Sequence, residues 1–436
     1  MKLPPDHARR VELNDEVHAR PPDSLVSPAR VSSLALLMDA ARRGDETARL
    51  GDLATAAGLP APAPGATHFS AEFGRFRLRW ERHTEFSRYT FVVPGLGADP
   101  FAEPAIDAVP PSFVPELPGQ VISAAHVALV PATFEEPWLE DLSSAVFGGH
   151  VLIASNISGR SASAFTDFRI HADGFSRFVV RDRELTPRQA GRLVQRLLEI
   201  DAYKTLSLLA FPVARELGPF LARAEGELAA VTTGLAASVA ADEGVLLDRL
   251  TRLEAEIESR GAENQFRFGA ASAYYDLVGR RIAELREDRI QGFQTFREFV
   301  ERRLAPAMNT CLAAANRQEL LSRRVSRATQ LLSTRVDITQ SRQNQTLLES
   351  MDRRAKVQLR LQETVEGLSI AAVTYYIVGL VGYAAKGGKP LGFPLDPELT
   401  MALSIPAVLV LVGFGIRRIR RSAAGLRRER TGEERS

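Results

Sequence analysis

Hydrophobic and polar residues alternate in short runs along the first 200 residues of the chain. The runs are rich in β-forming side chains and are bounded by glycine and proline, as is typical of strands that end in turns. They comprise residues 30–38, 71–80 continuing into 85–93, 121–130, 151–155 and 175–180. The pattern therefore predicts a mixed α and β domain over residues 1–200.

From residue 201 onward the pattern is that of long helices. Apolar residues along 221–257 recur mostly every three, four or seven positions, which is one stripe of an amphipathic helix. A second helix is predicted over residues 272–304. The sixty residues from 307 to 366 then contain neither glycine nor proline. We expect a helical, coiled-coil-like stalk domain over residues 201–366.

Proline usage supports this division of the chain. Eighteen of the twenty-five prolines precede residue 190, and Pro306 is the only one between Pro219 and Pro390. Proline is excluded from helix interiors, so the later region is free to be helical. The boundary is predicted near residues 190–220, where Thr186 provides an N-cap and Pro187 opens a helix.

A helix over residues 307–366 would be about 90 Å long. A helix of that length is not stable alone in water and must pack on the preceding helices or on copies of itself. The sequence therefore predicts a homo-oligomer.

Two uncharged segments of eighteen residues follow the stalk, Leu368–Ala385 and Leu399–Ile416. As helices each would cover roughly 27 Å of a hydrocarbon core about 30 Å thick. The alternative is a buried helical hairpin of a soluble protein. We predict a transmembrane hairpin over residues 367–417, which makes the lipid bilayer a partner of the chain.

Basic residues flank the hairpin on both sides, whereas the connecting loop balances two lysines against two acids. The positive-inside rule then places both ends of the chain in the cytoplasm. The flanking residues are Arg353, Arg354, Lys356 and Arg360 before the first span, and Arg417, Arg418, Arg420 and Arg421 after the second. Residues 418–436 form a basic cytoplasmic tail, which would either anchor the topology or attract anionic lipids. The predicted fold is thus an α+β cytoplasmic domain, a helical stalk and a C-terminal two-helix transmembrane hairpin.

Composition restricts the function classes. The chain has 55 basic and 53 acidic residues, a balance that argues against a dedicated nucleic-acid binder. Its single cysteine, Cys311, excludes an internal disulfide and a multi-cysteine metal site.

One predicted strand carries a candidate site. Along Arg77–Glu85 alternate residues share a face, so Glu81, His83 and Glu85 would lie together with Arg77 and Arg79, while Trp80 and Phe86 share the other face. Two carboxylates beside an imidazole could bind a metal or move protons. The alternative is a solvated sheet face with cross-strand ion pairs.

Other motifs give no activity. Asn14–Pro21 could bind an anion through Arg20 or be a polar helix turn, and Gly148–His150 with the serines that follow suits a nucleophile or a strand and turn. No HExxH, GxSxG or phosphate-binding loop occurs. The sequence predicts no catalytic residue and no cofactor.

Four strings resemble those of an uncharacterised bacterial family of membrane-anchored proteins, domain of unknown function 3422. They are RWERHTEFSRYTF (79–91), TDFRIHADGFSRFVVRD (166–182), QAGRLVQRLLEID (189–201) and SMDRRAKVQLRLQETVEGLS (350–369). The resemblance spans nearly the whole chain. It implies membrane attachment and supplies no activity. We expect the protein in the bacterial inner membrane.

The order of elements also resembles that of CorA-type divalent-cation channels. In that family the first membrane helix ends in a Gly-Met-Asn signature that begins the selectivity filter. The matching place here offers Gly382-Tyr383-Ala384, which keeps the glycine and lacks the asparagine. The resemblance implies an oligomer whose pore mouth lies at these residues, with magnesium selectivity in doubt.

Two functions follow as hypotheses. The first is an oligomeric channel or transporter subunit whose cytoplasmic domain regulates an ion path. The second is a membrane-anchored scaffold or sensor whose α/β domain binds a cytoplasmic protein partner.

Overall fold

A computed structural model describes residues 4–11, 13–14, 23–97, 99–133, 141–237, 243–388 and 396–432. Of the segments discussed above, residues 15–21 with Arg20, Lys389 in the hairpin loop and Arg435 in the tail lie outside the described residues. The chain divides into two compact units, Met1–Leu331 and Leu332–Ser436, which are taken separately below.

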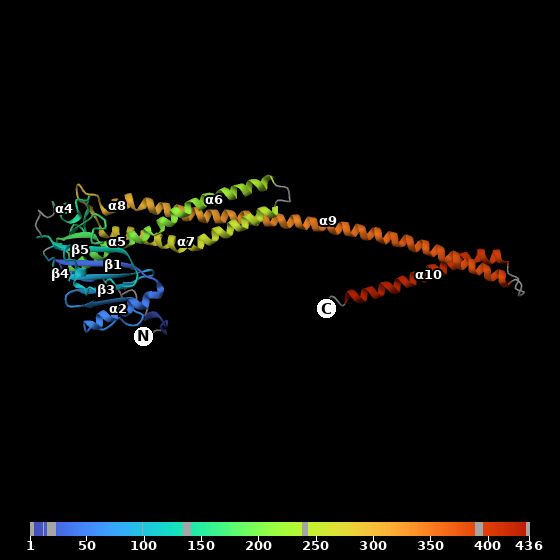
Figure 1. Ribbon diagram of the computed structural model, residues 1–436, viewed down its shortest axis with the longest axis horizontal. Coiled ribbons are helices and arrows are strands. Elements are labelled where there is room, and N and C mark those ends of the chain that lie inside the picture. The colour runs from blue at the N-terminus through green and yellow to red at the C-terminus, as the bar shows by residue number, and fades with distance from the viewer. Residues whose placement is uncertain are drawn as a thin grey trace. The chain divides into compact units, whose positions relative to one another are not determined.

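Within the described residues, the first unit contains one nine-stranded sheet (Figure 1). The strands are β1 (Ala29–Leu37), β2 (His68–Glu72), β3 (Arg77–Arg82), β4 (Phe86–Pro94), β5 (Gln120–Pro131), β6 (Ile153–Ile157), β7 (Ala162–Thr166), β8 (Ser176–Asp182) and β9 (Asp288–Arg289). Their order across the sheet is β2-β3-β4-β1-β5-β8-β7-β6-β9. Neighbouring strands are antiparallel except β5 and β8, which are parallel.

The predicted strands are confirmed, with two differences. The run 71–80 comprises the end of β2 and the start of β3, because a turn with Gly74 at φ 77° reverses the chain between them. Strand β7 was not predicted, since its sequence ASAFT consists mostly of small residues and contains a single large apolar side chain.

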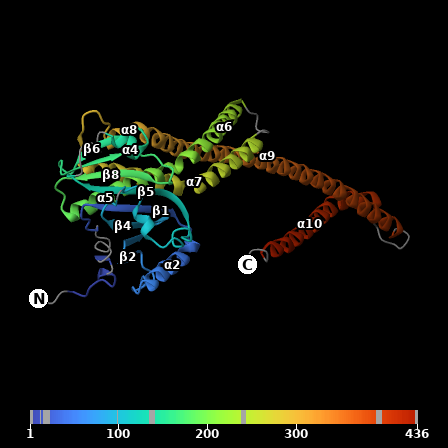
Figure 2. The ribbon, with the colours of Figure 1, turned by 60° about the vertical axis from the view of Figure 1, so that its left-hand side comes forward.

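Helices cover both faces of the sheet (Figure 2). On one face α5 (Pro187–Leu208) packs on β5, and α7 (Glu243–Leu285) packs on α5. On the other face lies α2 (Arg43–Ala56). The side chains of β1 alternate accordingly, with Val31 in the α5 core and Leu34 in the α2 core.

The start of α5 confirms the predicted cap. The Thr186 hydroxyl accepts a hydrogen bond from the Gln189 N–H, and the Gln189 side chain accepts one from the Thr186 N–H. This reciprocal pair satisfies amides that no helical carbonyl can reach. The boundary predicted at residue 200 lies inside this helix.

The remaining elements of the first unit are short segments beside the sheet and the helices that follow α5. They are the 3₁₀ turns η1 (Ala40–Arg42) and η2 (Ala105–Ala108), the helices α4 (Leu142–Phe147), α6 (Ala210–Ala237) and α8 (Phe296–Arg303), and the first part of α9 (Ala305–Gly388).

The helix predicted over residues 272–304 is wrong as one element. It consists of the end of α7, the short strand β9 and α8. Arg286, at φ 49°, takes the left-handed conformation that ends α7. Gly292, at φ 87°, lies in the turn after β9, and Thr295 then caps α8 through Glu298. The apolar spacing continues across this break and therefore concealed it.

The second unit contains the rest of α9 and α10 (Pro397–Gly432). Both predicted spans are helical, and each helix contains a stretch long and apolar enough to cross a membrane. Helix α10 continues beyond the predicted span at Ile416, so the basic segment is helical as far as Gly432.

Candidate functional site

Of the predicted face, Arg79 and Glu81 on β3 are buried beneath α5. Glu81 Oε1 accepts a hydrogen bond of 2.7 Å from Arg79 Nη2, and its Oε2 accepts one of 2.5 Å from Arg88 Nη2. Glu81 and Arg88 are register partners on β3 and β4. The cross-strand pairing was thus expected, but the expected solvated face is wrong because α5 covers it.

The ion-pair network extends to the helices. Glu199 of α5 lies 3.5 Å from the Arg88 guanidinium, and Arg281 of α7 donates to the same carboxylate. Burial alone would raise the pKa of Glu81, but the guanidinium groups of Arg88 and Arg79 outweigh it and lower this pKa to about 2. Glu81 is therefore held ionised between two cations, and Arg88 connects it to Glu199 of α5. The two guanidinium groups would repel a third cation such as a metal ion.

The other two predicted residues lie beyond the end of β3 at Arg82. The His83 ring stacks on Phe86 with centroids 4.3 Å apart, and Glu85 accepts a 2.8 Å hydrogen bond from Arg267. The tight turn between β3 and β4 returns Phe86 to the α5 face, so its predicted position on the Trp80 face is wrong. Glu81, His83 and Glu85 do not form a group of converging ligands among the described residues.

The serines after Gly148–His150 lie on strands and turns. Ser155 on β6 donates to Glu287, and Ser163 on β7 donates to Asn156, each at 2.8 Å. Each hydroxyl is thus oriented toward an acceptor other than an imidazole, as in the strand-and-turn interpretation of this stretch.

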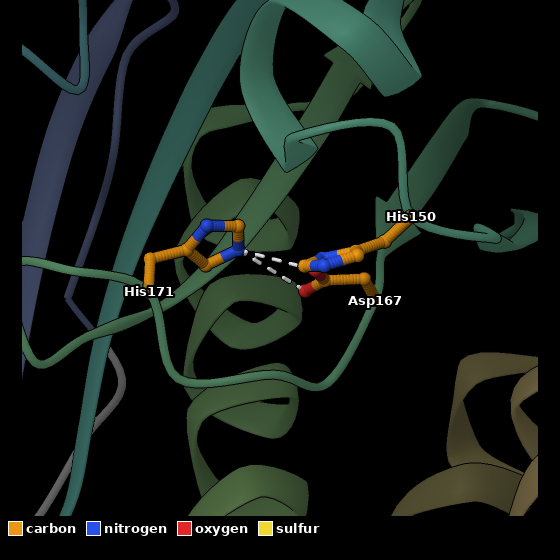
Figure 3. Close-up of side chains that lie close together, drawn as sticks. All are labelled: His150, Asp167 and His171. Carbon is orange, nitrogen blue, oxygen red and sulfur yellow. Dashed lines mark hydrogen bonds and ion pairs between the residues drawn. The ribbon is translucent and has the colours of Figure 1, made fainter.

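A different group of side chains converges in the first unit (Figure 3). His150 Nδ1 lies 2.8 Å from Oδ2 of Asp167, and His171 Nε2 lies 3.1 Å from the same oxygen. One ligand atom of each residue lies within 4.8 Å of the others. The Asp167 side chain is fully buried, whereas that of His150 is 38% exposed.

Backbone geometry positions each residue of this cluster. His150 follows α4 through Gly148 and Gly149, both at positive φ, and the Ser143 hydroxyl donates to the His150 carbonyl at 2.8 Å. Asp167 directly follows β7, and its Oδ1 accepts a hydrogen bond from the Arg169 N–H.

His171 begins the turn that leads into β8. Its N–H donates to the Phe175 carbonyl at 2.9 Å, and its own carbonyl accepts from the Gly174 N–H. The Phe147 ring lies against it, with centroids 6.2 Å apart.

Two imidazoles and a carboxylate are a donor set that binds first-row transition metals. Sequence spacing gave no signal for this cluster, because His150 comes from a loop that β6 and β7 separate from Asp167 and His171. The Asp167–His171 spacing of four residues would indicate one face only in a helix, and this segment is a loop. Only the pairing of β7 with β6 and β8 brings the three together.

In the second unit, the predicted pore-mouth residues lie within α9, before its end at Gly388. Gly382 packs against Met401 of α10, where a Cβ atom would lie 2.8 Å from the Met401 sulfur. Tyr383 is 77% exposed and Ala384 is exposed. Gly382 therefore serves the close approach of the two hairpin helices.

A groove of about 550 Å³ lies along this helix pair. Thr374 lies in its wall, and its buried hydroxyl has no hydrogen-bond partner within the described part of the chain. A buried hydroxyl without a partner is costly, more so in an apolar medium.

The sequence matches a family described as "Protein of unknown function (DUF3422)" over residues 5–423. No curated protein matches the chain. A solved structure described as "structure of the full-length CmaX protein" is 13% identical, with a TM-score of 0.18 over 68% of this chain and 89% of that one. It assigns neither a fold nor an activity to this chain.

Proposed function

The chain belongs to the DUF3422 family of proteins of unknown function, and from that premise we propose that it is a membrane-anchored scaffold or sensor. The α9–α10 hairpin lies in the bacterial inner membrane, and the sheet domain binds a protein partner in the cytoplasm.

The observation that carries the anchor is the exposure of large apolar side chains on both hairpin helices. Soluble proteins rarely expose an apolar surface of this extent, and a bilayer would cover it. Exposed residues include Leu368, Tyr375, Tyr376, Leu380 and Tyr383 on α9, and Leu399, Leu403, Val410, Leu411 and Phe414 on α10. A soluble hairpin would instead bury these residues in a core, yet none of the apolar window of α10 is buried.

The proposed topology puts both ends of the chain in the cytoplasm. Arginines flank the hairpin on its two open sides, and the short loop near Asp396 and Glu398 carries no excess of positive charge. The loop therefore faces the periplasm in this proposal.

Membrane fractionation of the full-length protein tests the anchor. Resistance to extraction by alkaline carbonate is expected, and release into the soluble fraction would overturn the proposal.

In intact cells, a membrane-impermeant maleimide is expected to label Glu398→Cys but not Ser350→Cys, both exposed positions. The native Cys311 is buried and provides a low background. The reverse labelling would overturn the topology.

A scaffold is favoured over a pore by the position of Gly382, which packs on Met401 inside the hairpin. Crosslinking of the full chain in cells, followed by affinity purification, is expected to recover one cytoplasmic protein at a stoichiometric level. Recovery of lipid-modifying or translocation machinery only, or of no protein, would contradict the scaffold.

An ion path through a homo-oligomer is the second candidate, and Thr374 favours it. Its hydroxyl has no hydrogen-bond partner among the described residues and lies in the uncharged span Leu368–Ala385, where it would offer an oxygen to an ion or a water molecule. Liposome flux that Thr374→Val removes, and that the stalk control Thr364→Val leaves unchanged, would support the path. Absence of flux in the wild-type protein would reject it.

A further inference from the structure

We propose that His150, Asp167 and His171 bind one transition-metal ion of the Zn²⁺ class, with a coordination position left open for water or an external ligand. The proposal is independent of the membrane anchor, since all three residues lie in the sheet domain.

The geometry fits a metal with small adjustments. Two ligands at about 2.05 Å from a tetrahedral zinc lie about 3.3 Å apart. The Asp167 oxygen already lies 2.8 Å from His150 Nδ1 and 3.1 Å from His171 Nε2. The two imidazole nitrogens lie within 4.8 Å of each other, so a modest rotation of one ring completes the site.

The charge environment of Asp167 points to the same conclusion. Three other buried carboxylates of this domain face a basic side chain, since Glu46 faces Arg82, Glu81 faces Arg88 and Asp201 faces Lys204. Asp167 is fully buried, and its ion-pair partners among the described residues are the two imidazoles. A buried carboxylate needs a compensating cation, which a metal ion held by the two imidazoles would supply.

The cluster is also accessible to solvent, and hydrogen bonds hold its residues in place. His150 is partly exposed, and the adjacent Val151 and Ile170 are 85% and 79% exposed, so an ion can approach from solvent. The Ser143 hydroxyl fixes the loop that carries His150, and the Arg169 N–H fixes the Asp167 carboxylate. Outer hydrogen bonds of this kind orient the ligands of metal sites. Three protein ligands leave the fourth position of a tetrahedral ion open.

The alternative role is a purely structural hydrogen-bonded cluster, and titration distinguishes the two. Full-length protein without a polyhistidine tag, purified in mild detergent and stripped with chelator, is titrated with Zn²⁺ by calorimetry. One ion per chain is expected. Co²⁺ is expected to give the absorption bands of a four-coordinate site, which a hydrogen-bonded cluster would not.

Substitutions test which residues bind the metal ion. His150→Ala removes a partly exposed ligand, and His171→Ala a more buried one, and each is expected to weaken Zn²⁺ binding by more than about 100-fold. His68→Ala, on the exposed edge of β2, is the matched control and is expected to bind as the wild type does.

Three outcomes would overturn the proposal. They are the absence of stoichiometric Zn²⁺ binding, binding that His150→Ala leaves unchanged, or binding that His83→Ala removes instead. The last result would return the metal to the strand face predicted from the sequence.

Discussion

The stability of the sheet domain at low pH depends on the ionised carboxylate of Glu81. Its pKa is lowered to about 2 because Arg88 and Arg79 outweigh the effect of burial. A lowered pKa gives stability that is fully present above the unfolded-state value near 4.5 and is lost as the pH falls toward 2. We expect Glu81→Gln to lower the free energy of unfolding at pH 7 by on the order of 3 kcal/mol. The deficit should shrink between pH 4.5 and pH 2.

Glu72→Gln is the control for this prediction. Glu72 pairs with Arg77 at 3.6 Å but is 70% exposed, so its loss is expected to cost less than about 1 kcal/mol at any pH. Thermal unfolding followed by tryptophan fluorescence at pH 7 and pH 3 measures both variants. An equal deficit for Glu81→Gln at the two pH values would contradict the assignment of the stability to its charge.

Residue patterns predicted which side chains of β3 share a face, but not what lies on it. Alternation places Arg79 and Glu81 together because the strand period is two. Charged residues usually indicate solvent, and only the packing of α5 and α7, which bring Glu199 and Arg281, turns this face into a buried network. His150 and Asp167 could not be paired from sequence, because their contact depends on strand pairing across the sheet.

At the scale of the element, Gly191 lets α5 pack closely against the backbone of the N-terminal segment. A Cβ atom at this position would lie 1.6 Å from the carbonyl oxygen of Asp23, which is backbone and cannot turn aside. We expect Gly191→Ala to lower the free energy of unfolding by at least about 2 kcal/mol. Calorimetry or chemical denaturation of the full chain measures this.

Gly279 of α7 supplies the opposite case. Nothing lies within 4 Å of the Cβ atom that alanine would add there. Because alanine favours the helical backbone over glycine, Gly279→Ala is expected to stabilise the protein by about 0.5–1 kcal/mol. Destabilisation by Gly279→Ala, or tolerance of alanine at Gly191, would show that the α5 or α7 packing differs from that described.

Helix signals were reliable where local chemistry alone sets the boundary. Thr186, Pro187 and Gln189 lie next to one another and fix the start of α5 without help from the rest of the fold. The break between α7 and α8 depends on the left-handed conformation of Arg286, and an arginine in the sequence does not predict that conformation. Long-range packing selects that conformation, so the sequence pattern continued across it.

At the scale of the whole molecule, every residue of the stretch 341–365 of α9 is exposed. Its large apolar side chains are Leu347, Leu348, Met351, Val357, Leu359, Leu361 and Val365. A solitary helix is only marginally stable in water, so a homo-oligomer in which copies of this stretch pack together would account for it.

Charge substitutions test that assembly. Leu361 is 67% exposed in the single chain, so Leu361→Glu is expected to leave the fold of one chain intact. The mass of the oligomer is expected to fall by at least the mass of one subunit. Gln362→Glu adds the same charge one position away, on a polar site, and is expected to keep the wild-type mass. Light scattering coupled to size exclusion in mild detergent measures all three proteins. A monomeric wild type would remove both the oligomer and the ion path, because two spans of one chain cannot enclose a pore, and would leave the anchored scaffold standing.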